Sequence, residues 1–243
     1  MSTQQFFSLA KFPGTTGAFF YNYFFKYHGM DAEYLPKKCD NLPEDLARIV
    51  QGGGKGISVS MPFKEAVIPH LSEYSDKVKQ FQSCNSIKIE KGKLYGESTD
   101  VAGCKGVLKL VRPFNSVHIL GNGSISHMFQ RIFLESGVNF KVYARSLGNW
   151  EFRNCEADLT INATALGTAS KESPLSFLSA NAQIVDLALK ENDLSKLCLE
   201  YGASYFSGLY FYKFVFLEQF KFYTGQECNE QIFDARASNF LIT

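Results

Sequence analysis

Short apolar runs alternate with segments of helical periodicity along most of this chain, and that alternation limits the folds open to it. Buried strands are predicted at residues 5–12, 32–36, 56–61, 116–120, 140–146, 157–164, 182–188 and 203–208. Helices are predicted at residues 17–29, 41–54, 64–71, 100–111, 123–137, 173–180, 193–202, 209–225 and 228–241. Residues 85–98 alternate about Lys91 and Gly92, which predicts a hairpin. The pattern favours an α/β fold with a crevice at the carboxyl ends of parallel strands.

The composition fits a soluble globular protein and excludes several other classes. The 243 residues are 45% hydrophobic and 20% charged, and a net charge of +1 gives no electrostatic footprint for nucleic acid or an anionic membrane. No apolar run reaches the roughly 18 residues of a membrane span, and the N-terminus lacks a signal-peptide pattern. The six cysteines form no CxxC pair and none has a histidine at metal-ligand spacing, so we expect reduced cytosolic thiols and no metal site.

A glycine turn follows one of the predicted strands. Gly121, Asn122 and Gly123 lie between that strand and a predicted helix. In this context backbone N–H groups meet a pyrophosphate at the N-terminus of the helix. Ser126 stands at the third glycine position of the GxGxxG fingerprint, and an ordinary tight turn between strand and helix gives the same pattern. The turn therefore indicates a dinucleotide site without establishing one.

The next predicted strand ends in Arg145 and Ser146. Sites selective for NAD usually end this strand with an acidic residue that binds the ribose hydroxyls, whereas an arginine suits the 2′-phosphate of NADP. A solvated surface arginine fits the same position. We expect NADP as the cofactor.

Lys64 occupies an electrostatically unfavourable position. The stretch "SVSMPFKEAV" passes from a strand into a predicted helix, and Lys64 lies in the first turn of that helix. A first turn favours anions because its unpaired N–H groups carry positive partial charge. Such an exception at the end of a strand indicates a functional position. Asp100 opens a later helix, either as its N-cap or as a carboxylate that orients the amine of Lys64.

Six segments occur in a specific order along the chain: "SVSMPFKEAVIPHL", "CNSI", "GESTDVAG", "LGNGS", "INATALG" and "GLYFYKFVFLEQFKFYTG". This ordered set resembles the shikimate dehydrogenase family over nearly the whole chain. The resemblance implies an N-terminal α/β substrate domain with a mixed sheet, residues 1–101 joined by C-terminal helices at 208–243. It also implies a shortened Rossmann-like NADP-binding domain at residues 102–207, with a parallel sheet.

The activity implied by the resemblance is the reversible NADPH-dependent reduction of 3-dehydroshikimate to shikimate, a step in aromatic amino-acid biosynthesis. The enzyme would be a cytoplasmic monomer or homodimer that takes a small cyclic hydroxy or keto acid and binds neither nucleic acid nor membrane. Lys64 matches the family's catalytic lysine and Asp100 its partner aspartate. An ammonium group there stabilises the oxygen on which charge develops as hydride arrives, and can supply its proton.

The remaining site residues are also carried over from the resemblance. Positions that match the substrate site are Thr15, Thr16, Ser60 and Asn85. Positions that match the cofactor site are Gly121, Asn122, Gly123, Ser124, Arg145, Ser146, Asn162 and Thr164.

Several family positions hold other residues in this chain. Gly17 replaces a serine that grips the substrate carboxylate, Val215 a substrate-binding glutamine, Leu189 a tyrosine and Ser124 a glycine of the turn. The connection from Arg145 to the next strand is also shorter than in the family. Three interpretations therefore stand: a shikimate dehydrogenase, a related dehydrogenase acting on quinate or another cyclic hydroxy acid, and a non-catalytic binding protein that retains the fold.

Overall fold

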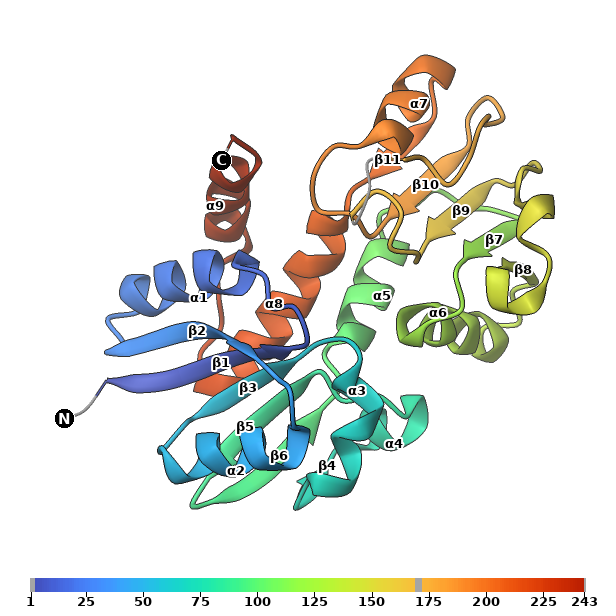
Figure 1. Ribbon diagram of the computed structural model, residues 1–243. Coiled ribbons are helices and arrows are strands. Elements are labelled where there is room, and N and C mark those ends of the chain that lie inside the picture. The colour runs from blue at the N-terminus through green and yellow to red at the C-terminus, as the bar shows by residue number, and fades with distance from the viewer. Residues whose placement is uncertain (1–2, 169–171, 243) are drawn as a thin grey trace. The chain divides into compact units, whose positions relative to one another are not determined.

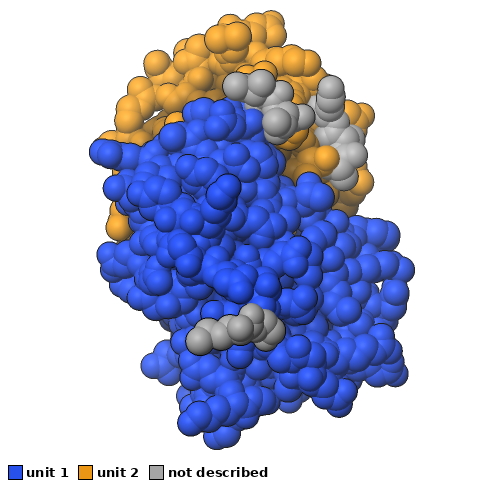
Figure 2. Space-filling view, turned by 90° about the vertical axis from the view of Figure 1, so that its left-hand side faces the viewer, with its two compact units in different colours: residues 1–99, 216–243 blue, residues 100–215 orange. Residues whose placement is uncertain are grey.

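Two β-sheets organise the structure, a computed structural model that describes residues 3–168 and 172–242 (Figure 1). The chain forms two compact units, which are residues 1–99 with 216–243 (unit 1) and residues 100–215 (unit 2; Figure 2). A six-stranded mixed sheet lies in unit 1 and a five-stranded parallel sheet in unit 2. The predicted fold class, α/β with one mixed and one parallel sheet, is confirmed.

Unit 1 is built on a sheet of strand order β2-β1-β3-β5-β6-β4. Strand β1 runs parallel to β2 and β3, β5 is antiparallel to both β3 and β6, and β6 is parallel to the edge strand β4. The elements of this unit are β1 (Gln4–Ala10), α1 (Thr16–Tyr27), β2 (Ala32–Lys38), α2 (Leu42–Gln51), β3 (Gly56–Val59), α3 (Phe63–Ala66), the 3-10 helix η1 (Ile68–His70), β4 (Glu73–Tyr74), α4 (Asp76–Phe81), β5 (Ser86–Glu90), β6 (Lys93–Glu97) and α9 (Glu230–Ile242).

The strand period of two gives this sheet two apolar faces. Leu9 of β1 joins a buried cluster with Leu46 and Ile49 of α2, while Phe6 points the other way and its ring lies 4.9 Å from that of Phe25 in α1. Figure 1 shows α1 and α2 on opposite faces of the sheet. The abundant aromatic residues therefore build the core on the α1 side, where Phe20 also stacks on Phe233 of α9 at 4.8 Å.

Unit 2 holds the parallel sheet, of order β11-β10-β9-β7-β8. Every residue of β7, β9 and β10 is buried, as expected for central strands covered on both faces. The elements are α5 (Asp100–Leu108), β7 (Val117–Leu120), α6 (Ser124–Glu135), β8 (Phe140–Tyr143), the 3-10 helices η2 (Arg145–Leu147) and η3 (Trp150–Arg153), β9 (Leu159–Asn162), β10 (Gln183–Asp186), α7 (Asp193–Tyr201) and β11 (Ser204–Phe206).

Helix α8 (Gly208–Thr224) belongs to both units, because the boundary between them falls at residues 215 and 216. Its first half packs on α5, where the side chains of Phe214 and Val215 lie so close to Gly106 and Gly103 that a Cβ at either glycine would overlap them. The sequence placed the boundaries at residues 101 and 208, so both differ in the structure. The second moves because a helix that contacts α5 along its first two turns stays with unit 2 over that length.

Three local predictions differ from the structure. Residues 173–180 were predicted as a helix, but Ser173 instead closes a turn in which its hydroxyl bonds both the N–H and the C=O of Leu175. Serine hydroxyls offer the backbone this alternative to a helix. Strand β4 and helix α4 were missed, because two and six residues are too short to show a period.

His118, near the middle of β7, makes unit 2 sensitive to pH. The side chain is buried, and its ring lies edge-on to Tyr143 with centroids 5.1 Å apart. Burial lowers the pKa of His118, and the nearby Lys141 charge lowers it further. A histidine in the unfolded chain titrates near pH 6.5, so below about that pH the unfolded state binds more protons and the free energy of unfolding falls.

We therefore expect the Tm to drop between about pH 7.5 and about pH 5.5, with a shallower slope in His118→Asn. The measurement is thermal denaturation at a series of pH values. Exposed His127→Asn, in the same unit, should keep the full slope. Equal slopes in wild type and His118→Asn would contradict the assignment.

Candidate functional site

A cavity of about 360 Å³ opens at the carboxyl ends of β7, β8 and β9 in unit 2. Ligands of open parallel sheets bind at this edge, where successive strand ends converge. The residues that line the cavity are Gly121, Asn122, Ala144, Arg145, Ser146, Trp150, Ala163, Thr164, Ala165 and Leu166. Five of them were predicted as cofactor-binding residues: Gly121, Asn122, Arg145, Ser146 and Thr164.

The glycine turn brings the backbone close to this cavity. Gly121 has φ of 102°, and a Cβ there would lie 2.8 Å from the carbonyl oxygen of Ala163, so the position requires glycine. Gly123 is the N-cap of α6, and Ser124 is the first residue of the helix. Ser126, at the third glycine position of the fingerprint, donates its hydroxyl to the carbonyl oxygen of Gly121 at 2.7 Å. A side-chain hydrogen bond thus fixes the turn that leads into the N-terminus of α6, where backbone N–H groups favour anions.

Asn122 links the turn to its surroundings by its side chain. Its amide oxygen lies 2.9 Å from Nε2 of His127, and its amide nitrogen donates to the hydroxyl of Ser146 at 3.5 Å. Arg145 is exposed and begins η2, with its guanidinium carbon 5.9 Å from the ring centroid of Trp150. The end of β8 therefore presents a cation and a hydroxyl to the same cavity.

Asn162, predicted to bind the cofactor, is instead fully buried and its amide is used within the protein. Its nitrogen donates to Asp186 at 2.8 Å and to the carbonyl oxygen of Leu166 at 3.1 Å. Its oxygen accepts from the N–H and the hydroxyl of Thr164. Asn162 does not line the cavity, and its contacts hold Thr164, which does.

Asp186 is the centre of this buried network, and sequence reasoning missed it. The fully buried carboxylate accepts hydrogen bonds from Asn162, from Asn192 Nδ2 at 2.8 Å, from the hydroxyl of Tyr205 at 2.8 Å and from the N–H of Ala188 at 3.1 Å. Burial and the Asp186 charge together raise the pKa of Tyr205. An aspartate that directly follows the buried run of β10 was the available signal, because its charge has to be satisfied there.

The predicted substrate residues of unit 1 lie around the carboxyl ends of β1 and β3. Thr15 is the N-cap of α1 but its hydroxyl caps no N–H, and Thr16 is the first residue of that helix. Ser60 follows β3, is exposed, and donates its N–H to the carbonyl oxygen of Leu9 at the end of β1. Lys64 is half-buried in α3, and its carbonyl oxygen accepts the N–H of Cys84 at 2.8 Å.

Asn85, the fourth predicted substrate residue, is 5% exposed and its side chain bonds to Thr99. Its amide nitrogen donates to the hydroxyl of Thr99 at 2.9 Å, and its oxygen accepts the N–H of Thr99 at 2.7 Å. These bonds fix the backbone immediately before Asp100, the first residue of α5. Asp100 is counted in unit 2 and Lys64 in unit 1, so their pairing stays a prediction.

Val215, which occupies the family's glutamine position, is buried against Gly103 of α5. A glutamine does occur one turn later, at Gln219, and it is also buried. Its oxygen accepts the hydroxyls of Tyr21 at 2.6 Å and Ser58 at 2.9 Å, while its nitrogen donates to Ser86 and to a backbone carbonyl. All four hydrogen-bonding positions of this amide are filled, so Gln219 is a core residue of unit 1.

Among the described residues, no three His, Cys, Asp or Glu side chains gather closely enough to hold a metal ion. None of the described helices combines the length and the apolar character of a membrane span.

The parallel sheet, the tight glycine turn and the helix N-terminus over a cavity define a protein of the dinucleotide-binding α/β class. Comparisons narrow this class. Residues 16–87 match the family model of the shikimate dehydrogenase substrate binding domain. The chain is 28% identical over 233 residues to a shikimate dehydrogenase (NADP(+)) of Aquifex aeolicus, covering 86% of each.

A shikimate dehydrogenase-like protein of Haemophilus influenzae is 25% identical over 268 residues, covering 99% of this chain and 97% of the relative. The crystal structure of shikimate dehydrogenase from Aquifex aeolicus shares the fold, with a TM-score of 0.84 at 24% identity over 96% of this chain and 97% of the other. These findings all indicate the shikimate dehydrogenase family, and the resemblance inferred from the sequence is confirmed.

Proposed function

We propose that the chain is an NADP-dependent oxidoreductase that reversibly reduces 3-dehydroshikimate to shikimate. The observation that carries the proposal is the cavity of unit 2, where a backbone turn open only to glycine, a helix N-terminus and Arg145 meet. Relatives named shikimate dehydrogenase (NADP(+)) support both the cofactor and the reaction. The free cysteines agree with a cytoplasmic enzyme, which the sequence predicts.

The residues of the cavity fit a nicotinamide dinucleotide phosphate. The turn at Gly121 and the N-terminus of α6 would hold the pyrophosphate, because both present backbone N–H groups. Gly121 and Gly123 have no side chain that would keep the phosphates away from that backbone. Arg145 and Ser146 would hold the 2′-phosphate. When bound, the cofactor supplies or accepts the hydride.

The residues of unit 1 would hold and activate the ring. Thr15 and Thr16 follow β1 and Ser60 follows β3, and their hydroxyls would suit the carboxylate and hydroxyls of a polyhydroxylated acid. Lys64 would give a proton to the ring oxygen as the carbonyl becomes an alcohol and would take it back in the reverse direction, and Asp100 would orient the amine. A buried Asn85 would fix the chain that carries Asp100.

The test is formation of NADPH on adding shikimate, compared with quinate as substrate and with NAD as cofactor. We expect turnover with shikimate and NADP. Turnover with quinate alone would favour the second interpretation, a related dehydrogenase, to which the apolar Val215 at the glutamine position also points. Binding of NADP by calorimetry without turnover of any ring acid would leave a non-catalytic binding protein, and no binding of either kind would overturn the proposal.

Arg145 provides a test of cofactor choice. Arg145→Ala should weaken NADP binding roughly 10- to 100-fold and NAD binding much less, because only NADP carries the phosphate that a guanidinium would bind. The measurement is calorimetric titration with each dinucleotide. Arg131→Ala, an exposed arginine of α6 paired with Glu135, serves as the matched control and should change neither. Equal losses for NADP and NAD in Arg145→Ala would reject the 2′-phosphate role.

A further inference from the structure

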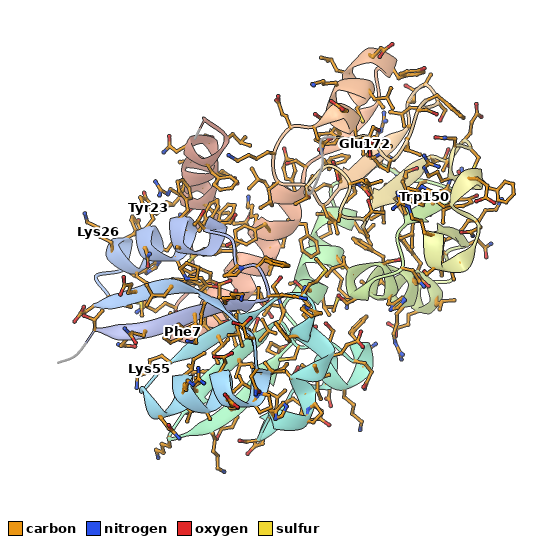
Figure 3. All side chains as sticks on the ribbon, viewed as in Figure 1. Phe7, Tyr23, Lys26, Lys55, Trp150 and Glu172 are labelled. Atoms are coloured by element: carbon orange, nitrogen blue, oxygen red, sulfur yellow. The ribbon has the colours of Figure 1, made fainter. Side chains whose placement is uncertain are left out.

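Trp150 is the single tryptophan of the chain and lines the cavity of unit 2. It begins η3, in the connection from β8 to β9, where Figure 3 labels it. Trp150 was not among the site residues predicted from the sequence. A half-buried indole in a dinucleotide-type cavity is either a packing residue or a surface for a planar ligand.

The indole is held from within the protein. The guanidinium carbon of Arg153 lies 4.5 Å from the ring centroid of Trp150. Arg153 is itself fixed, because Nη1 donates to the carbonyl oxygen of Trp150 at 3.0 Å and Nε to that of Pro174 at 2.5 Å. The ring also packs against a buried cluster that includes Leu120 and Leu175. These contacts orient the indole before any ligand arrives.

The turn that carries Trp150 is tied to β8. Asn149, the N-cap of η3, donates to the carbonyl oxygen of Val142 at 2.8 Å and accepts the N–H of Ala144 at 2.9 Å. Two hydrogen bonds therefore link the turn that carries Trp150 to the strand end that precedes Arg145. A ring that is already held in place loses little conformational entropy when a ligand binds. Less of the favourable free energy of the contact is therefore offset by the cost of ordering the side chain.

The chemistry of the cavity selects a planar aromatic ring attached to phosphates. The glycine turn and the α6 N-terminus suit a pyrophosphate, Arg145 suits a second phosphate, and an indole suits a stacked base. The connection between β8 and β9, residues 144–158, carries two aromatic side chains, Trp150 and Phe152, and of these Trp150 lines the cavity. Trp150 lies at the margin of the buried cluster and also lines the cavity, so a ligand in the cavity can reach it.

We propose that Trp150 is the surface on which the adenine ring of the dinucleotide stacks, and that this contact sets the affinity of the shortened nucleotide unit. The inference rests on the proposed NADP-binding function. Loss of a base–aromatic stack is expected to weaken binding about 10- to 100-fold.

The first experiment follows the fluorescence of wild-type protein during titration with 2′,5′-ADP, the adenine half of the cofactor. Because the chain has one tryptophan, emission excited at the long-wavelength edge, where the tyrosines do not absorb, reports this ring alone. We expect quenching that saturates with the calorimetric affinity. Calorimetric binding without any change in emission would overturn the role of Trp150 while leaving NADP binding intact, whereas no binding of NADP or of 2′,5′-ADP would overturn the proposed function itself.

The second experiment compares Trp150→Phe with Trp150→Leu. Both keep an apolar side chain against the buried cluster, but only phenylalanine keeps a stacking face. We expect calorimetric affinity for 2′,5′-ADP within a few fold of wild type for phenylalanine and about 10- to 100-fold weaker for leucine. Nicotinamide mononucleotide, which has no adenine, should bind all three alike.

Phe152→Ala is the matched control, because Phe152 lies in the same 3-10 helix, is 64% exposed and does not line the cavity. It should bind 2′,5′-ADP as wild type does. Equal affinities of Trp150→Phe and Trp150→Leu for 2′,5′-ADP would overturn the inference. A variant that loses affinity equally for 2′,5′-ADP and for nicotinamide mononucleotide would also overturn it, because such a loss indicates a structural role for Trp150.

Discussion

Replacing Lys64 with alanine is expected to lower kcat for ring reduction by roughly 50- to 1000-fold while changing KM little. The ammonium group interacts with the ring oxygen most strongly when that oxygen carries developing negative charge. Its removal therefore raises the barrier of the chemical step more than it weakens substrate binding, and kcat and kcat/KM should fall together. Steady-state kinetics with 3-dehydroshikimate and NADPH measure both constants.

The fold should tolerate this change. Helix α3 has no buried residue, and Lys64 contributes its backbone carbonyl to the N–H of Cys84, a bond that alanine retains. Lys55, labelled in Figure 3, is exposed and precedes β3, at the end of the strand opposite Ser60. Lys55→Ala is therefore the control and should keep wild-type kinetics. Wild-type activity in Lys64→Ala would contradict the assignment of Lys64 as the catalytic lysine.

Asp186→Ala is expected to lower the free energy of unfolding by about 3 kcal/mol or more. The substitution leaves the amides of Asn162 and Asn192, the hydroxyl of Tyr205 and the N–H of Ala188 without their buried acceptor. Each unsatisfied buried donor costs about 1–3 kcal/mol before the site relaxes or admits water. For a chain of this size the Tm should fall by roughly 6–12 °C.

Urea and thermal denaturation measure this loss. Asp193→Ala is the matched control, because Asp193 lies in α7 close to the network but its ion pair with Lys196 is exposed on both sides and contributes little. Asp186→Asn should fall between the two, since it keeps one acceptor oxygen. Equal denaturation midpoints for Asp186→Ala and Asp193→Ala would mean that the network does not stabilise unit 2.

Local patterns in the sequence were sufficient for most elements of the fold. The aromatic spacing of α1, the glycines after α2 and the hairpin turn at Lys91 and Gly92 each depend on residues a few positions apart. The same holds for the turn at Gly121, whose positive φ is a local requirement. Four of the five predicted cavity residues, Gly121, Asn122, Arg145 and Ser146, follow β7 or β8 at such local signals, whereas Thr164 was carried over from the family resemblance.

The remaining parts of the site depend on contacts between distant segments, which no local pattern reports. Asn162 was predicted to face the cofactor, but its amide nitrogen donates a hydrogen bond to Asp186 on the neighbouring strand. Trp150 lines the cavity because Arg153 and Pro174 hold its turn, and the segment around Pro174 was itself predicted as a helix. Burial of Gln219 likewise depends on Tyr21, 198 positions earlier in the chain.

Helix α8 has a consequence for anyone who would exchange the nucleotide unit for that of another protein. The chain leaves unit 2 inside this helix, so a junction there interrupts hydrogen bonds between successive turns. A working hybrid has to splice one helix to another in register. The incoming unit also has to supply both α5 and the first half of α8, because Gly103 and Gly106 of α5 pack against Val215 and Phe214 within unit 2. Under the 2′-phosphate role proposed for Arg145, the cofactor preference of such a protein is therefore easier to change at that one position than by recombining whole units.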